Sequence, residues 1–374
     1  MASNKKRVPL NDLSRRFASS TVLRQEISEL LVAGPYLNGA YTQEFEKEFA
    51  NFIGARWSLG VSSGTTALEL AIKSLDLAEG SHVGLAANAG GYASIAVINS
   101  GMVPYYLDVD ANGLLTLDII SQSATNFAIV IVTHLYGQAA EIENIYQFLK
   151  SSGKFLIEDC AHATGSRFGN SRLGNFSDVS AFSFYPTKNL GAAGDAGAIC
   201  TSDEKIYRRV VELRQYGWQT RYFSSTPKGG NYRIDEIQCL VLLRQLEHLD
   251  RNNLVRKEIW NRYRNATIST NCRLIGSDEQ SFVAHLGVII TPYREKFQTF
   301  MEKKLIDTAI HYPFPDYIQP GISKQLDLKL PQTELFCSSV VTIPLFPEMT
   351  EVEIMRVESA IGQYCELSGG HRCT

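Results

Sequence analysis

Three consecutive segments decide the fold class of this chain of 374 residues: Phe127-Ala-Ile-Val-Ile-Val-Thr133, Glu141-Ile-Glu-Asn-Ile-Tyr-Gln-Phe-Leu-Lys150 and Lys154-Phe-Leu-Ile-Glu-Asp159. The first is continuously apolar, as expected of a β-strand that is covered on both faces. In the second, apolar side chains recur at helical spacing and share one face. The third resembles the first. A strand, a helix and a strand in this order predict an α/β fold with a mainly parallel sheet.

The pattern changes in the last third of the chain. Ile234 to Trp260 is a long helix-favouring stretch, Phe282 to Thr291 is typical of a strand, and Glu351 to Cys365 is typical of an amphipathic helix. We therefore expect a large domain over residues 1–250 and a smaller C-terminal α+β domain over residues 251–374, since element types are more predictable than boundaries.

The composition excludes several classes of function. Lysine and arginine total 36 against 39 acidic residues, which gives a net charge of −3 and no basic field for nucleic acid or an anionic membrane. Seven cysteines without a CxxC pair indicate reduced thiols rather than a metal or disulfide framework. No signal segment precedes the first helix-like stretch, and no apolar run is long enough to span a membrane. We expect a cytoplasmic protein that binds no metal and has a small-molecule partner.

Three segments combine residues that suit chemistry. The first is Ser62-Ser63-Gly64-Thr65-Thr66, directly before a helical pattern. Free N–H groups at a helix start bind phosphate, although serine and threonine are also common helix caps. The second is Glu158-Asp159-Cys160-Ala161-His162, where a buried strand ends and ligands bind in open α/β sheets. Because side chains alternate along a strand, we expect only one of the two carboxylates to face a ligand.

The third segment contains Lys188. It lies between an aromatic strand, Val179 to Phe184, and the small-residue loop Gly191 to Gly197. A lone lysine is usually a solvated surface residue, but an amine buried in such a place has a lowered pKa and can form a Schiff base with an aldehyde. A phosphate seat, a strand-end carboxylate and a buried lysine are together the three groups that pyridoxal phosphate requires.

These motifs resemble those of the DegT/DnrJ/EryC1/StrS aminotransferases, which are pyridoxal-phosphate enzymes that aminate keto-sugar nucleotides. The similarity covers nearly the whole chain in the expected order and rests on the following segments: Pro9-Leu-Asn-Asp-Leu13, Pro35-Tyr36-Leu37-Asn38-Gly39, Ser63-Gly64-Thr65-Thr66-Ala67, His134-Leu-Tyr-Gly-Gln138, Glu158-Asp-Cys-Ala-His162, Ser183-Phe-Tyr-Pro-Thr-Lys188, Asn231-Tyr-Arg-Ile-Asp-Glu-Ile-Gln238, His311-Tyr-Pro313 and Ile343-Pro-Leu-Phe-Pro347. The resemblance implies the aspartate-aminotransferase-like fold type I, with a large mixed, mainly parallel sheet and a smaller C-terminal domain.

The resemblance also implies roles for particular residues. Lys188 would bind the cofactor aldehyde covalently and move protons, and Asp159 would pair with the pyridine nitrogen. The phosphate would be held by three residues of one subunit and by one residue of its neighbour, so that a homodimer is required. These are Gly64, Thr65 and Ser183, with Asn231 from the neighbouring subunit.

Further residues would line the cleft for the sugar nucleotide. They are His134, Tyr136, His311 and Tyr312. The acidic pyrophosphate would need basic contacts, for which the candidates are Arg214, Arg221, Lys228 and Arg233, although each is more often a solvated surface charge.

The chain departs from the family pattern at two positions. His162 stands where many relatives have a glutamine beside the phenolic oxygen of the cofactor, and an imidazole can still donate a hydrogen bond there. Gly90 stands where relatives have an aromatic ring stacked on the cofactor. We expect Tyr92, two residues later, to take over the stacking, or the cofactor face to be covered in another way.

The implied activity is transfer of an amino group, with L-glutamate as the expected donor, to C-3 or C-4 of a nucleotide-linked keto-deoxysugar in amino-sugar biosynthesis. Sugar dehydratases of the same family replace the lysine by histidine, and Lys188 argues against that class. A cyclitol or another non-nucleotide ketone remains an alternative substrate. A non-catalytic family member is the other alternative, although such a protein would be expected to have lost Lys188 or Asp159.

Overall fold

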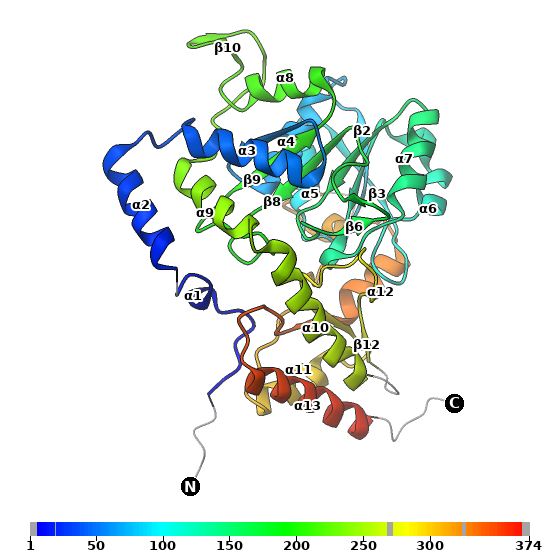
Figure 1. Ribbon diagram of the computed structural model, residues 1–374. Helices are drawn as coiled ribbons and strands as arrows, with labels where there is room; N and C mark the ends of the chain where they lie inside the picture. Colours follow the sequence, from blue (N-terminus) through cyan, green and yellow to red (C-terminus); the bar gives the residue numbers. More distant parts are fainter. Residues whose placement is uncertain (1–5, 19, 268–271, 324–326, 369–374) are drawn as a thin grey trace.

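The structure is a computed structural model that describes residues 6–18, 20–267, 272–323 and 327–368. A seven-stranded sheet in the order β1-β9-β8-β5-β4-β2-β3 forms its centre (Figure 1). The strands are β1 (Trp57–Val61), β2 (His82–Ala86), β3 (Val103–Leu107), β4 (Ile129–Thr133), β5 (Phe155–Asp159), β8 (Val179–Ser183) and β9 (Gly197–Thr201). Strand β9 is antiparallel to both of its neighbours and the other pairs are parallel, so the expected α/β class with a mixed, mainly parallel sheet is confirmed.

Helices cover both faces of this sheet, which explains why its central strands are apolar throughout. On one face, Val130 and Val132 of β4 pack into a core with α3 (Ala40–Ile53), α7 (Ile142–Ser151) and α9 (Glu236–Leu246). On the other face, the alternate residues of β4 pack with α4 (Gly64–Ser74), α5 (Tyr92–Asn99) and α8 (Glu204–Leu213). Because strand side chains alternate between faces, a strand buried on both sides must be apolar at every position.

Shorter elements surround the sheet. The helices among them are α1 (Leu13–Arg16), α2 (Thr21–Ala33), α6 (Leu117–Gln122) and the 3₁₀ turns Ala124–Asn126, Leu135–Gly137 and Asp316–Ile318. The strands form two hairpins, β6 (Arg167–Phe168) with β7 (Ser171–Arg172) and β10 (Trp218–Thr220) with β11 (Phe223–Ser224). Helix α2 and the β10–β11 hairpin project from the body of the molecule (Figure 1).

The C-terminal third builds a separate core around a three-stranded sheet, β12-β13-β14. Its elements are α10 (Leu249–Thr267), β12 (Arg273–Leu274), β13 (Gly287–Ile290), α11 (Arg294–Lys303), α12 (Pro331–Ser339), β14 (Val340–Ile343) and α13 (Glu351–Ser368). Val8, from the N-terminus of the chain, is fully buried in this core. The proposed division at residue 250 lies just inside α10, which runs from the large part of the molecule into the small one (Figure 1).

Two details differ from the sequence prediction. The helical stretch from Ile234 to Trp260 is broken into α9 and α10 between residues 246 and 249. The strand expected over residues 282–291 is limited to Gly287–Ile290, because the segment before it docks on the large sheet domain: the N–H groups of Val283 and His285 donate to the carbonyls of Gly137 and Tyr136.

Within the described ranges, no helix combines the length and the apolar character needed to cross a lipid bilayer.

Candidate active site

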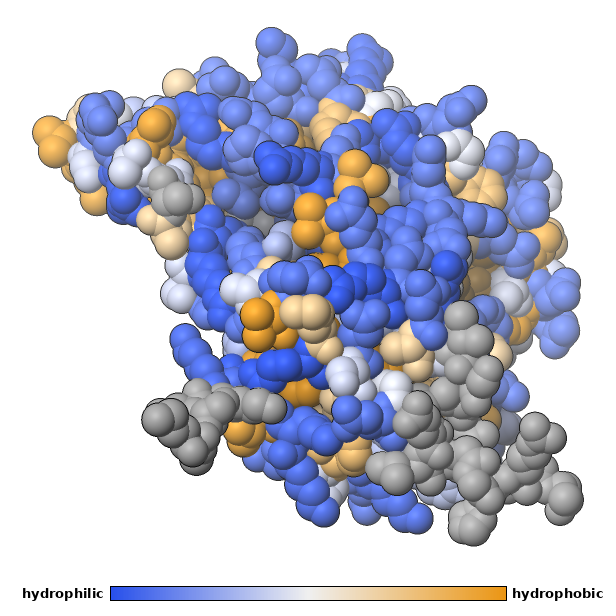
Figure 2. All heavy atoms as spheres, turned by 60° about the horizontal axis from the view of Figure 1, so that its bottom comes forward, coloured by the Kyte–Doolittle hydropathy of each residue, from blue (hydrophilic) through white to orange (hydrophobic). Residues whose placement is uncertain are grey.

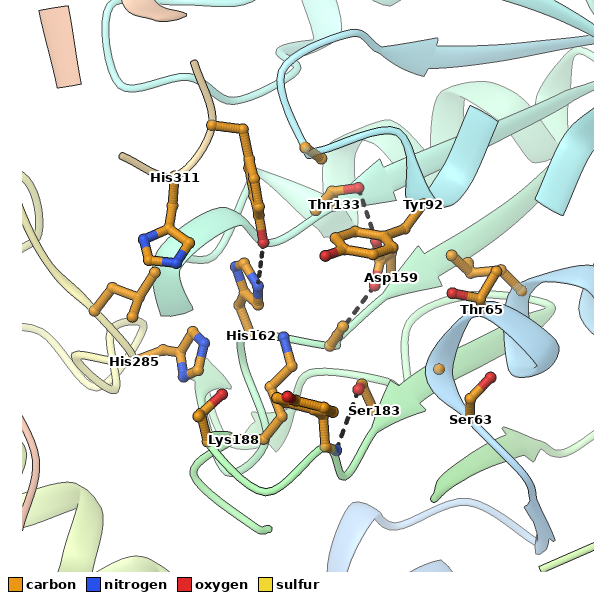
Figure 3. A pocket seen from close by; sticks show the side chains of 18 of the residues that line it. Ser63, Thr65, Tyr92, Thr133, Asp159, His162, Ser183, Lys188, His285 and His311 are labelled. Atoms are coloured by element: carbon orange, nitrogen blue, oxygen red, sulfur yellow. Dashed lines mark hydrogen bonds between the residues drawn. The ribbon is translucent and has the colours of Figure 1, made fainter. Parts of the chain in front are cut away.

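A cavity of about 450 Å³ lies at the carboxyl ends of β4, β5 and β8, where the large sheet meets the C-terminal part. The start of α4 and the start of α5 form one wall, and the segments that contain His285 and His311 form the opposite wall (Figure 3). Ligands of open α/β sheets bind at this edge, because helix starts and loops converge there.

Lys188 is in the middle of this cavity. It lies in the turn after β8, where its N–H group donates to the carbonyl of Tyr185 at 2.8 Å, and its amine extends into the cavity (Figure 3). Burial lowers the pKa of the amine from 10.5 to about 8, although the nearby carboxylate of Asp159 opposes this effect. A buried amine with a lowered pKa is the form of lysine that attacks aldehydes.

Asp159 ends β5 and faces the same cavity. Its carboxylate accepts hydrogen bonds from the Thr133 hydroxyl at 3.0 Å and from the Ala161 N–H group at 3.1 Å. Burial raises the pKa of this carboxyl, and these two hydrogen bonds and the charge of Lys188 act in the opposite direction. A buried carboxylate requires such partners, and a protonated ring nitrogen would be a further one.

Glu158 points to the other face of the sheet, as strand alternation requires. Its carboxylate accepts N–H groups of Gly174 at 2.8 Å and Phe176 at 2.9 Å, and it contacts His134 at 3.2 Å. The prediction that His134 lines the sugar cleft is wrong for this side chain. It is fully buried behind the sheet, because its ring is needed to satisfy Glu158 and the N–H group of Ala140.

The start of α4 lines the cavity. Ser63 caps the helix by accepting the Thr66 N–H group at 3.1 Å, and Gly64 and Thr65 follow at the first helical positions. A Cβ atom on Gly64 would lie 2.5 Å from Cβ of Ser183, so glycine lets the helix start approach the end of β8. Free N–H groups, the helix dipole and hydroxyl groups from two elements converge here, as an anion site requires.

His162 has a defined hydrogen-bonding direction. Its Nδ1 accepts a hydrogen bond from the N–H group of Tyr136 at 3.2 Å, so the proton of the neutral ring is on Nε2. Nε2 faces the cavity and lies 3.5 Å from the hydroxyl of Tyr312. Burial holds the pKa of this imidazole well below its usual value. His162 therefore offers a hydrogen-bond donor, which suits a phenolate oxygen.

The position of Gly90 is filled by another ring. Gly90 has a φ of +78°, and a Cβ atom there would lie 2.7 Å from the ring of Tyr312. Tyr92 begins α5 and lines the cavity, with its ring centroid 6.0 Å from that of Tyr312 and the planes 76° apart. Two aromatic side chains thus lie at the wall where the resemblance leads us to expect one stacked ring. That Tyr92 stacks on the cofactor stays a prediction.

The remaining predicted residues divide into two groups. His311 and Tyr312 line the cavity, as does Ser183. Tyr136 does not: it is fully buried, and its hydroxyl donates to the carbonyl of His311, so it supports the wall from behind.

Asn231 and Arg233 lie outside the cavity of their own chain, in the segment between the β10–β11 hairpin and α9. Asn231 is exposed and its backbone pairs with Gln215. The Arg233 guanidinium lies over the ring of Tyr216 at 5.3 Å. A role for either residue in a cofactor site would require the neighbouring subunit.

Several cavity residues were not predicted. Thr133 ends β4 directly before the His134 motif, and Tyr185 lies within the Lys188 motif, but neither residue was given a role from the sequence. His285 has no such signal: it is an isolated histidine about 100 residues after Lys188, and only the docking of the C-terminal part brings it into the cavity.

The donor set fits pyridoxal phosphate. Lys188 offers an amine, Asp159 a carboxylate, His162 an N–H donor, and the start of α4 with Ser183 a phosphate-binding site. These groups come from separate elements but open into one cavity (Figure 3). An aldehyde, a pyridine nitrogen, a phenolic oxygen and a phosphate are the four groups that they would bind.

Known proteins have similar sequences and similar folds. A curated dTDP-3-amino-3,6-dideoxy-alpha-D-galactopyranose transaminase from Aneurinibacillus thermoaerophilus is 34% identical over 345 residues, which is 91% of this chain and 95% of that protein. The solved structure of DesV from S. venezuelae, in complex with a ketimine intermediate, has a TM-score of 0.93 at 30% identity and covers 97% of this chain and 99% of its own. The structure of ntda from Bacillus subtilis with bound cofactor pmp has a TM-score of 0.89 at 26% identity. The match covers 98% of this chain and 86% of that chain.

The family model of the DegT/DnrJ/EryC1/StrS aminotransferase family matches residues 20–362, which include every cavity residue described above. With this match, with relatives above 30% identity and with a lysine and an aspartate in one buried cavity, the chain belongs to the DegT/DnrJ/EryC1/StrS aminotransferase family and is a pyridoxal-phosphate-dependent aminotransferase of fold type I.

Proposed function

We propose that this aminotransferase transfers the amino group of L-glutamate to the C-3 keto carbon of a nucleotide-linked deoxysugar. The observation that carries the proposal is the buried Lys188 amine in a cavity that also holds the Asp159 carboxylate. The name of the curated transaminase from Aneurinibacillus thermoaerophilus specifies a dTDP-linked 3-amino sugar. This name supports a nucleotide-linked substrate and amination at C-3.

Lys188 would move the proton in both halves of the reaction. When bound, pyridoxal phosphate supplies an electron-withdrawing ring that makes the adjacent carbon of an attached amine acidic. The Lys188 amine, with a pKa of about 8, would take the proton from that carbon and would deliver a proton to the carbon on the other side of the shared nitrogen. A base works best when its pKa is near the working pH, and burial brings this lysine there.

Other side chains would hold the cofactor in the orientation that Lys188 needs. Asp159 would keep the proton on the ring nitrogen, and His162 would donate its Nε2–H to the phenolic oxygen. Gly64, Thr65 and Ser183 would bind the phosphate at the start of α4. Asp159 and Ser183 end strands, and Gly64 and Thr65 begin a helix, so regular structure fixes the positions of these four residues.

The cavity mouth suits a sugar. Tyr92 and Tyr185 are each about half exposed there, and His311 adds a polar group beside Tyr312. Aromatic faces bind the apolar faces of sugar rings, while imidazole and phenol groups bind hydroxyls. The structure thus supports a substrate ring near the mouth.

The pyrophosphate of the substrate would contact basic residues of the 214–233 segment. Arg214 forms an ion pair with Glu46, and the amine of Lys228 lies 3.6 Å from the carboxylate of Glu79. Arg221 and Arg233 instead lie over tyrosine rings at 4.9 and 5.3 Å, and no ion pair to either is present among the residues described. These two arginines are therefore the stronger candidates.

A homodimer would complete the site. Asn231 is exposed and lies outside the cavity of its own chain, so it would reach the phosphate only in a neighbouring subunit. Apolar side chains are exposed on α2, where Val32 is 89% exposed, and on the β10–β11 hairpin, where Tyr222 is 75% exposed. Figure 2 shows a mostly hydrophilic face with apolar groups on the projecting edge formed by α2. Such exposed apolar groups are typical of interfaces.

A substrate panel tests the proposal. The purified protein with pyridoxal phosphate is incubated with L-glutamate and with thymidine-, uridine- and guanosine-linked 3-keto and 4-keto sugars, and the products are identified by NMR. We expect amination at C-3 of a nucleotide-linked sugar, and no turnover by Lys188→Ala or Lys188→Arg. Turnover of a free cyclitol ketone but of no nucleotide sugar would contradict the substrate class.

Borohydride reduction of the cofactor-loaded protein tests the role of the lysine independently. We expect the cofactor to be attached to the peptide that contains Lys188, as detected by mass spectrometry. Attachment to another lysine would contradict the assignment.

A further inference from the structure

The proton of His285 can be located from its surroundings. His285 is 97% buried and lines the cavity, and its Nδ1 lies 2.8 Å from Oδ1 of Asn189, the residue that follows Lys188. Two carbonyl groups fix which atom of Asn189 faces the ring. Its amide nitrogen donates to the carbonyl of Val283 at 3.1 Å, and a carbonyl can only accept.

A second amide confirms this orientation. The Asn189 nitrogen also donates to Oδ1 of Asn253 at 2.7 Å, and the Asn253 nitrogen in turn donates to the carbonyl of Thr164 at 3.1 Å. Oδ1 of Asn189 is therefore an acceptor, so Nδ1 of His285 must carry the proton. In the neutral ring, Nε2 then has a free lone pair.

The surroundings keep the ring of His285 neutral. The groups that face it are His162, Lys188, His311 and the guanidinium of Arg256, which donates to the backbone carbonyl of His285 at 3.3 Å. Burial is the largest cause that holds its pKa well below the usual value, and these groups act in the same direction because each is positive when protonated. An imidazolium is disfavoured here.

The two histidines beside Lys188 thus present opposite groups. The rings of His162 and His285 lie 4.4 Å apart, inclined at 35°. Nε2 of His162 carries a proton because Nδ1 accepts a backbone N–H group, whereas Nε2 of His285 does not. In Figure 3 both rings lie on the same side of the Lys188 amine, opposite to Asp159 and Tyr92. The cavity therefore has one fixed donor and one fixed acceptor next to the amine.

We propose that His285 is a positioning residue for Lys188, whose unprotonated Nε2 accepts a hydrogen bond from the Lys188 amine whenever that amine is free during turnover. This inference rests on the proposed function, because it gives the lysine a partner in both half-reactions. After the amine has taken a proton from the substrate carbon, it is an ammonium with three N–H donors, and Asp159 lies on the other side of the cavity. An acceptor at His285 would keep the ammonium directed at the carbon to which the proton returns.

Two substitutions separate this role from a structural one. In His285→Asn, the side-chain amide can replace Nδ1 and donate to Asn189, but nothing replaces Nε2. In His285→Gln, the longer side chain can place an acceptor oxygen near the position of Nε2, but the bond to Asn189 is lost. We expect His285→Asn to slow the half-reaction with L-glutamate about tenfold or more, as the loss of one hydrogen bond implies, and His285→Gln to be less affected. Thermal unfolding and cofactor absorbance show that each variant is folded and loaded.

A measurement without cofactor gives a second readout. The pH dependence of Lys188 acylation in the cofactor-free protein, followed by mass spectrometry of its peptide, reports the pKa of the amine. Loss of an acceptor disfavours the ammonium, so the pKa should fall in His285→Asn by about half a unit or more and stay nearer to wild type in His285→Gln.

The outcomes distinguish the two proposals. Wild-type rates and an unchanged Lys188 pKa in His285→Asn would overturn the role of His285, as would a pattern in which only His285→Gln is impaired. A defect confined to the half-reaction with the keto-sugar would also overturn it, since His285 would then act on the sugar. A wild-type protein that reacts with neither glutamate nor a keto-sugar would instead contradict the proposed function.

Discussion

The chemistry of the site at the residue scale depends on burial. The Lys188 amine loses its hydration in the cavity, and this disfavours the ammonium more than the nearby Asp159 carboxylate favours it, so the pKa settles at about 8. The same loss of water raises the pKa of Asp159 and lowers that of His162. Burial therefore moves the lysine and the histidine toward their neutral forms, while hydrogen bonds and the lysine charge oppose it at Asp159.

Incorporation of cofactor should depend on pH with this lysine pKa. Only the neutral amine attacks an aldehyde, so the rate constant for binding of pyridoxal phosphate to the cofactor-free protein should rise about tenfold per pH unit at low pH and level off above about pH 8. Stopped-flow absorbance measures it, with Nα-acetyl-lysine as the control that continues to gain reactivity up to about pH 10. A protein curve that follows the control would contradict a lowered pKa.

Replacement of Asp159 by asparagine should separate binding from chemistry. The amide cannot hold a proton on the ring nitrogen by charge, so kcat should fall at least about 10²-fold and cofactor should be retained more weakly. Single-turnover kinetics and equilibrium dialysis measure the two effects. Thr133→Val is the matched control, because it removes only one hydrogen bond to the same carboxylate and should cost much less. Wild-type rates in Asp159→Asn would contradict the role of the carboxylate.

At the scale of single elements, close packing of α4 against β8 forms the phosphate seat. Gly64 allows the helix start to approach Ser183, because a Cβ atom there would lie 2.5 Å from Cβ of Ser183 and 3.1 Å from its Cα. The helix start can present its N–H groups to a phosphate only from this position.

Gly64→Ala should therefore weaken cofactor binding. The added methyl group must push α4 away from β8, and overpacking of this kind costs about 1–3 kcal/mol, so we expect the Kd of pyridoxal phosphate to rise about tenfold or more. Gly362→Ala in α13 is the matched control, because nothing lies within 4 Å of its Cβ position. An unchanged Kd in Gly64→Ala, measured by fluorescence titration, would show that this contact does not shape the seat.

An ion pair connects the N-terminal helix α1 to α13. Arg15 donates to both carboxylate oxygens of Glu353 at 2.7 and 2.8 Å, and the pKa of Glu353 is lowered from 4.5 to about 2, with Arg15 as the main cause. A carboxylate whose pKa is lower in the folded protein stabilises the fold above its unfolded pKa. This contribution is lost as the pH falls from about 4.5 to about 2.

Glu353→Gln should lower the thermal stability at neutral pH. We expect a loss of about 1–2 kcal/mol and a decrease in Tm of a few degrees at pH 7, and the difference from wild type should shrink between pH 4.5 and pH 2. Differential scanning calorimetry over this pH range measures it. The exposed pair Arg208–Glu204 is the control, since Glu204→Gln should change Tm little. A Tm difference that is constant down to pH 2 would contradict the linkage.

At the scale of the whole molecule, the cavity exists only where two parts of the chain meet. The sheet domain supplies Lys188, Asp159 and the phosphate seat, while the C-terminal part supplies His285 and His311. The proposed dimer would add Asn231 from the neighbouring subunit. Sites built in this way are incomplete in an isolated sheet domain.

Mixed dimers test the sharing of residues between subunits. Lys188→Ala and Asn231→Asp should each be inactive alone, because one lacks the amine and the other places a carboxylate near the phosphate. After the two are unfolded, mixed and refolded, half of the dimers should be heterodimers with one intact site, so about one quarter of wild-type activity should return. Refolded wild type is the control for yield. No recovery of activity would contradict the contribution of Asn231 across the interface.

The predictable part of the fold and of the site is the part that depends on local patterns. The parallel strands were evident because a strand covered on both faces is apolar at every position, as in β4. Lys188 and Asp159 were candidates because Asp159 ends such a strand and Lys188 follows one, at the edge where ligands bind. The placement of His134 could not be predicted, since nothing local shows that Glu158 behind the sheet needs its ring.

The sequence by itself determined the class of the large sheet, the strand–helix–strand order over residues 127–159, and the motifs that surround Lys188. Only the tertiary structure decided which side chains share the cavity. His285 enters it and Tyr312 fills the space left at Gly90, because the C-terminal part docks on the sheet edge. The spacing of apolar residues in a segment indicates which of its faces is buried. Contacts between segments about 100 residues apart depend on how those buried faces pack together, and no local pattern encodes that packing.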